Sequence, residues 1–124
     1  MANEIRATLR VSRTQSSDSF KFEFNPGTVQ VDQAAVGEGG QVYTIGTSEE
    51  AISFVDITTE GWLTMQNLDA TNYVDWGPED GGAMIEMGRM EAGEPAAMRM
   101  FPGATLRLKA NTAACQVLVK VLED

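Results

Sequence analysis

The sequence contains no histidine among its 124 residues. The commonest general base and the commonest transition-metal ligand of proteins are therefore both missing. A Ser-His-Asp or Cys-His catalytic site is excluded, and so is a zinc or iron site built on imidazole ligands.

Cysteine and long hydrophobic runs are also scarce. The single cysteine, Cys115, has no partner for an internal disulfide, and its apolar strand pattern predicts a buried core residue rather than a reactive thiol. No run of about 18 apolar residues is present, and the first residues lack the apolar segment of a secretory signal. We therefore expect no membrane association and maturation in a reducing cytoplasm.

Basic residues are outnumbered two to one, because 9 Lys and Arg face 18 Asp and Glu and give a formal net charge of −9. Binding to nucleic acid would act against that charge, and no Lys or Arg cluster reverses it locally. We expect no nucleic-acid partner; the charge suits solubility, or partners with basic patches.

Alternation of apolar and polar residues, with turn residues about every ten positions, is the dominant pattern that the sequence does contain. It predicts an all-β protein, an antiparallel β-sandwich or jelly roll of roughly nine or ten short strands without substantial helix, in one domain over residues 1–124. Eleven segments are candidates for these strands: residues 4–11, 20–24, 28–36, 41–45, 51–57, 62–66, 73–76, 83–87, 96–101, 105–109 and 115–121.

Several local expectations follow from this pattern. Phe20, Phe22 and Phe24 should share one face of the second strand. The glycine-rich residues 37–40 predict a hairpin-type turn and not a dinucleotide fingerprint, since the spacing is wrong and no helix follows. Thr47 and Glu50 match the spacing of a helical capping box, but the β-branched and aromatic residues that follow favour a turn into a strand over residues 51–57.

Two groups of polar residues have side chains that could bind a metal ion or catalyse a reaction. Asn67, Asp69, Asn72 and Asp75 offer oxygen ligands, but their spacing does not match a calcium loop and favours an Asx-rich turn. The pair Glu79 and Asp80 would be hydrated in an open hairpin turn, which is poor for acid–base catalysis. We therefore expect no metal, no cofactor and no catalytic residues.

The stretch over residues 61–88 concentrates large side chains, including both tryptophans and Tyr73. Met84 and Met87 should point to opposite faces of one strand, so that one of them lies outside the core. Methionine is common at adaptable interfaces, and contact with another subunit is as well supported as plain core packing. Alternatively, Trp62, Tyr73 or Trp76 could stack on sugar rings.

Five sequence strings resemble a recurring pattern in small structural proteins of tailed bacteriophages, over about residues 42–124. The strings are IGTSEEA (45–51), TTEGWL (58–63), NLDATNYV (67–74), FPGATL (101–106) and KANTAA (109–114). Such proteins are typically virion components with a sandwich or jelly-roll fold, and some cement or decorate the capsid, often as trimers. The family has no catalytic motif to transfer to this chain.

The resemblance implies a capsid cement or decoration protein that is made in the host cytoplasm and lies on the outer capsid surface of the virion. Its expected partners are the major capsid protein and further copies of itself, with a homotrimer favoured. The residues expected at interfaces are Trp62, Asp69, Tyr73, Trp76, Met84 and Met87. The alternatives are a tail or head–tail accessory protein, a carbohydrate-binding sandwich and, as the weakest, a cupin-type enzyme with an all-carboxylate metal site.

Overall fold

The structure is a computed structural model that describes residues 5–13, 22–33, 35, 37–54 and 56–124. Its internal contacts divide the chain into two compact units, Met1–Ala34 and Ala35–Asp124, which we call the arm and the body. Each unit is described by itself. The expectation of one domain across residues 1–124 stays a prediction.

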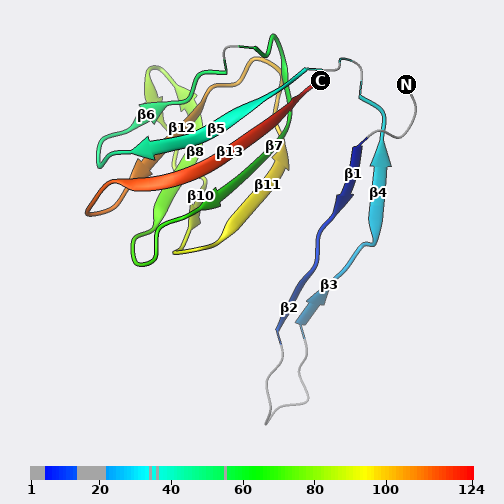
Figure 1. Cartoon of the computed structure of the whole chain (residues 1–124), viewed down its shortest axis with the longest axis horizontal. Coiled ribbons are helices and arrows are strands. Elements are labelled where there is room, and N and C mark those ends of the chain that lie inside the picture. The colour runs from blue at the N-terminus through cyan, green and yellow to red at the C-terminus, as the bar shows by residue number, and fades with distance from the viewer. Residues whose placement is uncertain (1–4, 14–21, 34, 36, 55) are drawn as a thin grey trace. The chain divides into compact units, whose positions relative to one another are not determined.

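The arm is a ribbon of antiparallel strand pairs (Figure 1). Strand β1 (Ile5–Thr8) pairs with β4 (Thr28–Val31), and β2 (Val11–Arg13) pairs with β3 (Phe22–Phe24). Within the described part of the arm, each pair has only two strands. Phe20, the first residue of the expected aromatic stripe, lies outside the described residues.

A one-residue bulge separates the two strand pairs of the arm. Residues 9–10 on one side lie opposite residues 25–27 on the other, between the pairs Thr8–Thr28 and Val11–Phe24. Gly27 takes a φ of 85°, a backbone conformation that glycine adopts without steric cost. Because strand side chains alternate, the extra residue brings Phe24 and Val29 to the same face, although one position is even and the other odd.

The body is a β-sandwich with two antiparallel sheets (Figure 1). One sheet has the order β11–β7–β13–β5, and the other has the order β10–β8–β12–β6, with β9 added to β8. The body strands are β5 (Glu38–Ile45), β6 (Glu50–Ala51), β7 (Glu60–Asn67), β8 (Val74–Asp80), β9 (Ala83–Met84), β10 (Gly88–Met90), β11 (Pro95–Arg99), β12 (Leu106–Ala110) and β13 (Cys115–Glu123).

One buried cluster joins the two sheets, and period-two alternation supplies it. In β13, Val117, Val119 and Val121 are buried while the residues between them face outward. Strand β7 contributes Leu63 to the same cluster, and β12 of the other sheet contributes Leu108. These positions follow directly from the apolar alternation, so the predicted all-β sandwich is confirmed. Among the described residues, no helix has the length and apolar character needed to cross a membrane.

The glycine-rich residues 37–40 do not form the expected turn. Strand β5 begins at Glu38 and continues through Gly39 and Gly40, which pair with Val121 and Lys120 of β13. A side chain on Gly40 would collide with the backbone of Val119, and its φ of 128° also favours glycine. Here the glycines permit close approach of two strands rather than a reversal of the chain.

Two further strand boundaries differ from the expectation. The strand expected over residues 51–57 is only β6, Glu50–Ala51; Ile52 and Ile57 are buried in irregular backbone, and Ile52 donates its N–H to the Leu106 carbonyl at 2.9 Å. The strand expected over residues 83–87 ends at Met84, and β10 begins at Gly88, inside an expected loop. Tertiary packing buries these apolar residues without regular pairing.

Candidate functional site

An apolar pocket of about 300 Å³ is lined by both sheets of the body. Leu63 and Met98 line it from one sheet, and Trp76 and Leu106 line it from the other. Two strongly exposed residues complete the lining: Met87, with 65% of its surface exposed, and Phe101, with 81%. The pocket therefore joins the core of the sandwich to exposed apolar side chains.

Backbone contacts place Met87 at this pocket. Its N–H donates to the Trp76 carbonyl at 3.0 Å, and the N–H of Ile85 donates to the Pro78 carbonyl at 2.8 Å. Residues 85–87 therefore lie alongside β8. Gly88 lies so close to the indole of Trp76 that a side chain there would overlap the ring. The lack of a side chain at Gly88 thus lets the indole pack against the backbone.

Phe101 reaches the pocket from a tight turn. The N–H of Ala104 donates to the Phe101 carbonyl at 3.0 Å, and Gly103 takes a φ of 83° within the Pro-Gly turn. This turn fixes the backbone but leaves the phenyl ring in solvent. A ring of this size exposed beside an apolar pocket is an uncommon feature of a monomeric surface.

Carboxylates are frequent in the segment that flanks Met87. Glu79 accepts a hydrogen bond from Arg107 Nε at 2.7 Å, and Arg107 also lies 3.7 Å from Glu49. Asp80 and Glu86 are exposed on the same segment. The neighbourhood of the pocket is therefore apolar in its lining and acidic along one flank.

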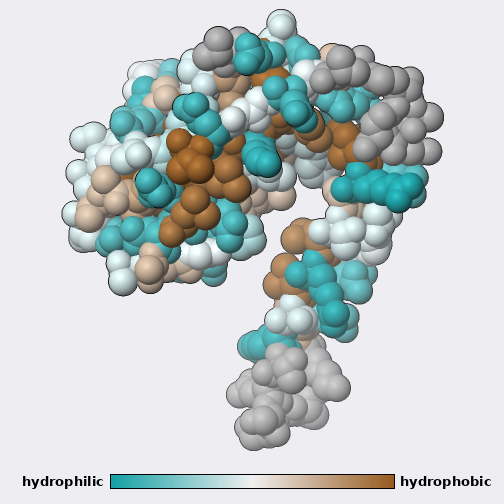
Figure 2. Space-filling model, in the orientation of Figure 1, coloured by the Kyte–Doolittle hydropathy of each residue, from teal (hydrophilic) through white to brown (hydrophobic). Residues whose placement is uncertain are grey.

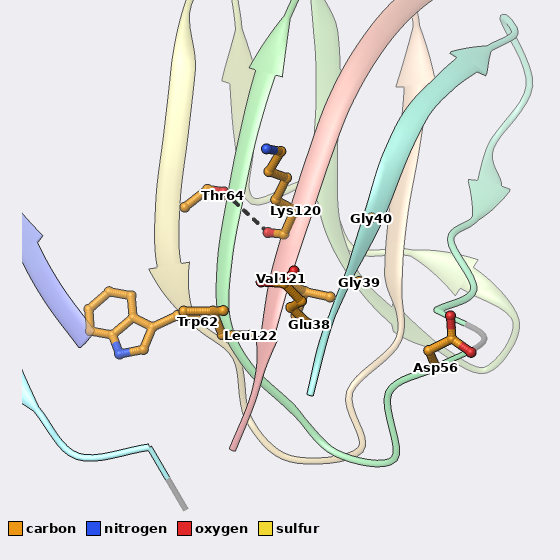
Figure 3. A pocket seen from close by; sticks show the side chains of 9 residues that line it. All are labelled: Glu38, Gly39, Gly40, Asp56, Trp62, Thr64, Lys120, Val121 and Leu122. Carbon is orange, nitrogen blue, oxygen red and sulfur yellow. Dashed lines mark hydrogen bonds between the residues drawn. The ribbon is translucent and has the colours of Figure 1, made fainter. Parts of the chain in front are cut away.

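A second, more polar pocket of about 550 Å³ lies over β5, β7 and β13 (Figure 3). Its lining includes Glu38, Asp56, Trp62 and Lys120, and the Thr64 hydroxyl donates to the Lys120 carbonyl at 3.2 Å. Figure 3 shows the indole of Trp62 pointing away from Asp56. The Trp62 ring and the Asp56 carboxylate therefore do not face the same part of the pocket.

The loop between β7 and β8 is held by two successive Asx turns. Asn67 is fully buried: its Nδ2 donates to the carbonyls of Asn72 at 2.8 Å, Met90 at 3.2 Å and Glu91 at 3.2 Å, and its Oδ1 accepts from the Asp69 N–H at 3.0 Å. These hydrogen bonds of the Asn67 amide connect the loop to the end of β10 and to the next residue. The structure confirms the Asx-rich turn expected from the sequence.

Asp69 forms the second Asx turn. Its Oδ1 accepts the N–H groups of Asn72 at 2.6 Å and Thr71 at 2.8 Å, and also the Thr71 hydroxyl at 3.2 Å. The backbone donors, Asn72 first, lower the pKa of the Asp69 carboxyl below its usual value because they stabilise the charged form. Asp69 thus has a structural role in the loop, and its expected place at an interface stays a prediction.

Tyr73 is half-buried under a guanidinium group. Arg89 lies 3.5 Å from the centre of the Tyr73 ring, and its Nε donates to Asp75 Oδ1 at 2.7 Å. The Asp75 side chain raises the pKa of Arg89, so the cation persists at every working pH. The carboxylate of Asp75, one of the possible oxygen ligands in the sequence, is therefore paired with a cation.

The two methionines considered for an interface have opposite environments. Met84 is buried and its N–H donates to Glu49 Oε2 at 2.8 Å, whereas Met87 is exposed. One of the pair thus lies outside the core, as expected, although they do not share a strand. Of the six residues expected at interfaces, only Trp76 and Met87 line the same pocket; Trp62, Asp69, Tyr73 and Met84 lie elsewhere.

The arm carries exposed apolar residues that are not among the residues expected at interfaces. Val11 and Phe24 are directly paired on one face, with Phe22 two residues away, and about half of each side chain is exposed. We call the following exposed residues the apolar face of the arm: Leu9, Val11, Phe22, Phe24 and Val29. The Phe-x-Phe alternation predicted the shared face of Phe22 and Phe24 but did not indicate that this face would be exposed.

Cys115 is fully buried, as its strand pattern predicted. Burial, the largest effect, and the nearby Asp69 raise the pKa of the thiol, so its reactive thiolate form is disfavoured. Among the described residues, no group of three or more Cys, Asp or Glu side chains is placed to hold a metal ion.

Comparison of the chain with protein-family models, with curated proteins and with solved structures gave no match. The geometry of the arm and of the body therefore carries the functional argument.

Proposed function

We propose that this protein is a structural subunit of a bacteriophage virion, a capsid cement or decoration protein that self-associates and bridges major capsid subunits. The observation that carries the proposal is the apolar face of the arm. An isolated two-stranded ribbon is marginal in water, and this one exposes about half of Phe22 and of Phe24. Covering each ring completely would contribute on the order of 1 kcal/mol, so the ribbon gains stability when another surface packs on it.

The body supports the same role. Its described residues give a well-packed sandwich whose carboxylates near the apolar pocket are paired with cations or exposed to water. A cement protein needs rigid units that present several contact surfaces, and many weak contacts multiplied over a shell give strong retention. The resemblance of residues 42–124 to small virion proteins supplies the identity of the assembly.

Capsid binding gives the direct test. Purified protein is added to expanded capsids that lack it, and binding is measured by co-sedimentation and by the temperature at which the shell opens. We expect saturable binding and a higher opening temperature. Protein that stays in the supernatant at every capsid concentration would refute the cement role, and binding confined to tails would favour the tail or head–tail alternative.

A carbohydrate-binding role is a second candidate, favoured by the open, more polar pocket that Trp62 lines together with Lys120 (Figure 3). Ligand pockets commonly combine an aromatic side chain with a few polar groups. A glycan array probed with the whole protein and with the Trp62→Ala variant separates the two functions. Specific hits that the substitution abolishes would favour sugar binding, and an array without hits would remove this candidate.

A further inference from the structure

We infer that the apolar face of the arm of one copy packs into the apolar pocket of the body of a second copy. This inference rests on the self-association in the proposed function and does not depend on the capsid. It names both contact surfaces, which the proposed function leaves open.

The two surfaces match in chemistry. The arm offers aromatic and β-branched side chains on one face of a ribbon, with Phe24 beside Val11. The pocket offers Met87, Met98 and Met100, and flexible thioether side chains adapt well to aromatic partners. Figure 2 shows that hydrophobic residues reach the surface in both units. Contact between the surfaces would remove Phe22, Phe24, Met87 and Phe101 from water together.

Charge selects the arm as the partner of the body. The four basic and four acidic residues of residues 1–34 cancel, so the whole net charge of −9 belongs to residues 35–124. Two bodies in direct contact would repel each other, whereas a neutral arm would not. On the arm, Arg13 lies directly opposite Phe22, whereas Arg10 is 3.6 Å from Glu23. The segment flanking the pocket carries the exposed Asp80 and Glu86. An acidic body therefore accepts the arm of another copy more readily than it accepts another body.

The geometry of such a contact predicts the form of the assembly. The arm and the pocket are different surfaces, so each copy gives one and receives one, and the contact is heterologous. A contact of this kind closes into a ring when the rotation between neighbours permits it. Two copies that exchange arms about a twofold axis form the smallest closed assembly, and a closed trimer, the expected homotrimer, is another.

Matched variants of the full chain test the inference, with oligomeric state measured by sedimentation velocity over a concentration series. We expect F22S/F24S in the arm and M87E in the pocket each to weaken association by about 30-fold or more. Glu23→Ser, which points to the opposite face of β3, and Leu68→Ser, an exposed apolar residue outside the pocket, are the controls and should change it by less than about threefold. Phe22, Phe24 and Met87 are exposed, so circular dichroism and urea unfolding should show intact bodies.

Mixing the two defective proteins gives the sharpest measurement. The F22S/F24S protein keeps its pocket and the M87E protein keeps its arm, so an equimolar mixture should form one-to-one heterodimers that neither protein forms alone. If arms instead pack on arms, the M87E protein would associate normally, and mixing it with the F22S/F24S protein would produce no heterodimer. That result would overturn the inference. A wild-type chain that stays monomeric at all concentrations also overturns it, as does an arm that packs on its own body.

Capsid binding then separates this inference from the proposed function. An oligomer that depends on Phe22, Phe24 and Met87 but ignores capsids would uphold the arm-to-pocket contact and refute the cement role. A protein that binds capsids while it remains monomeric in solution, and whose capsid binding is unchanged in M87E, would uphold the cement role and refute the arm-to-pocket contact.

Discussion

The arm and the body share one sequence pattern and reach different degrees of burial. In β13 of the body, alternate valines at 117, 119 and 121 are at most 1% exposed. In β3 of the arm, alternate phenylalanines at 22 and 24 are 54% and 49% exposed. Period-two alternation thus identifies which side chains share a face, but a second layer decides whether that face is buried. The arm has the pattern of a core strand without the layer that would cover it within its own unit.

The largest expected effect separates the two regions by stability. Leu108→Ala in the body should lower the free energy of unfolding by about 3 kcal/mol, because a fully buried leucine leaves a cavity among residues of both sheets. Phe24→Ala in the arm of the monomeric chain should change it by less than about 1 kcal/mol. Urea unfolding followed by tryptophan fluorescence measures both. Equal losses would mean that Phe24 is a core residue in solution.

A smaller loss is expected at the buried amide of the body. Asn67→Ala would leave the carbonyls of Asn72, Met90 and Glu91 without their shared donor, and should cost about 2 kcal/mol in the free energy of unfolding. Gln66→Ala, on the exposed side of the same strand, is the control and should cost less than about 0.5 kcal/mol. Hydrogen exchange should also speed up in residues 67–72. An Asn67→Ala protein as stable as the control would show that water replaces the amide.

The smallest expected effect is the pH response of the loop. The pKa of Asp69 is lowered in the folded state, so its charged form contributes stability above the unfolded value of about 3.9, and that contribution is lost as pH falls through the folded value. Asp69→Asn should therefore lower the urea midpoint more at pH 7 than near pH 2. Asp80→Asn, which changes an exposed carboxyl at the end of β8, is the control. A midpoint difference that is the same at both pH values would contradict the assignment.

The sequence was sufficient where neighbours in the chain decide the structure. The alternation in residues 115–121 predicted β13 and its buried face, and the density of Asn and Asp in residues 67–72 predicted the Asx turns. Both follow from local rules: the two-residue period of a strand and the short reach of an Asx side chain.

Long-range contacts decided what the sequence could not predict. Gly40 has the appearance of a turn residue until Lys120, eighty positions later in the chain, pairs with it and brings the Val119 carbonyl close to its Cα. Trp76 and Met87 were both among the expected interface residues, but Phe101, which lines the same pocket, is the first residue of a separate turn and was not. Phe22 and Phe24 were expected to share one face, but alternation carries no information about whether a second layer covers that face.

The position of β13 has a consequence for how the protein is made. This strand lies between β5 and β7 in its sheet, yet it is translated after both of them. Neither β5 nor β7 has this backbone partner until residues 115–123 have been synthesised. The sheet therefore cannot be completed during synthesis of the preceding residues, and a chain truncated before β13 would leave strand edges that can pair with other chains.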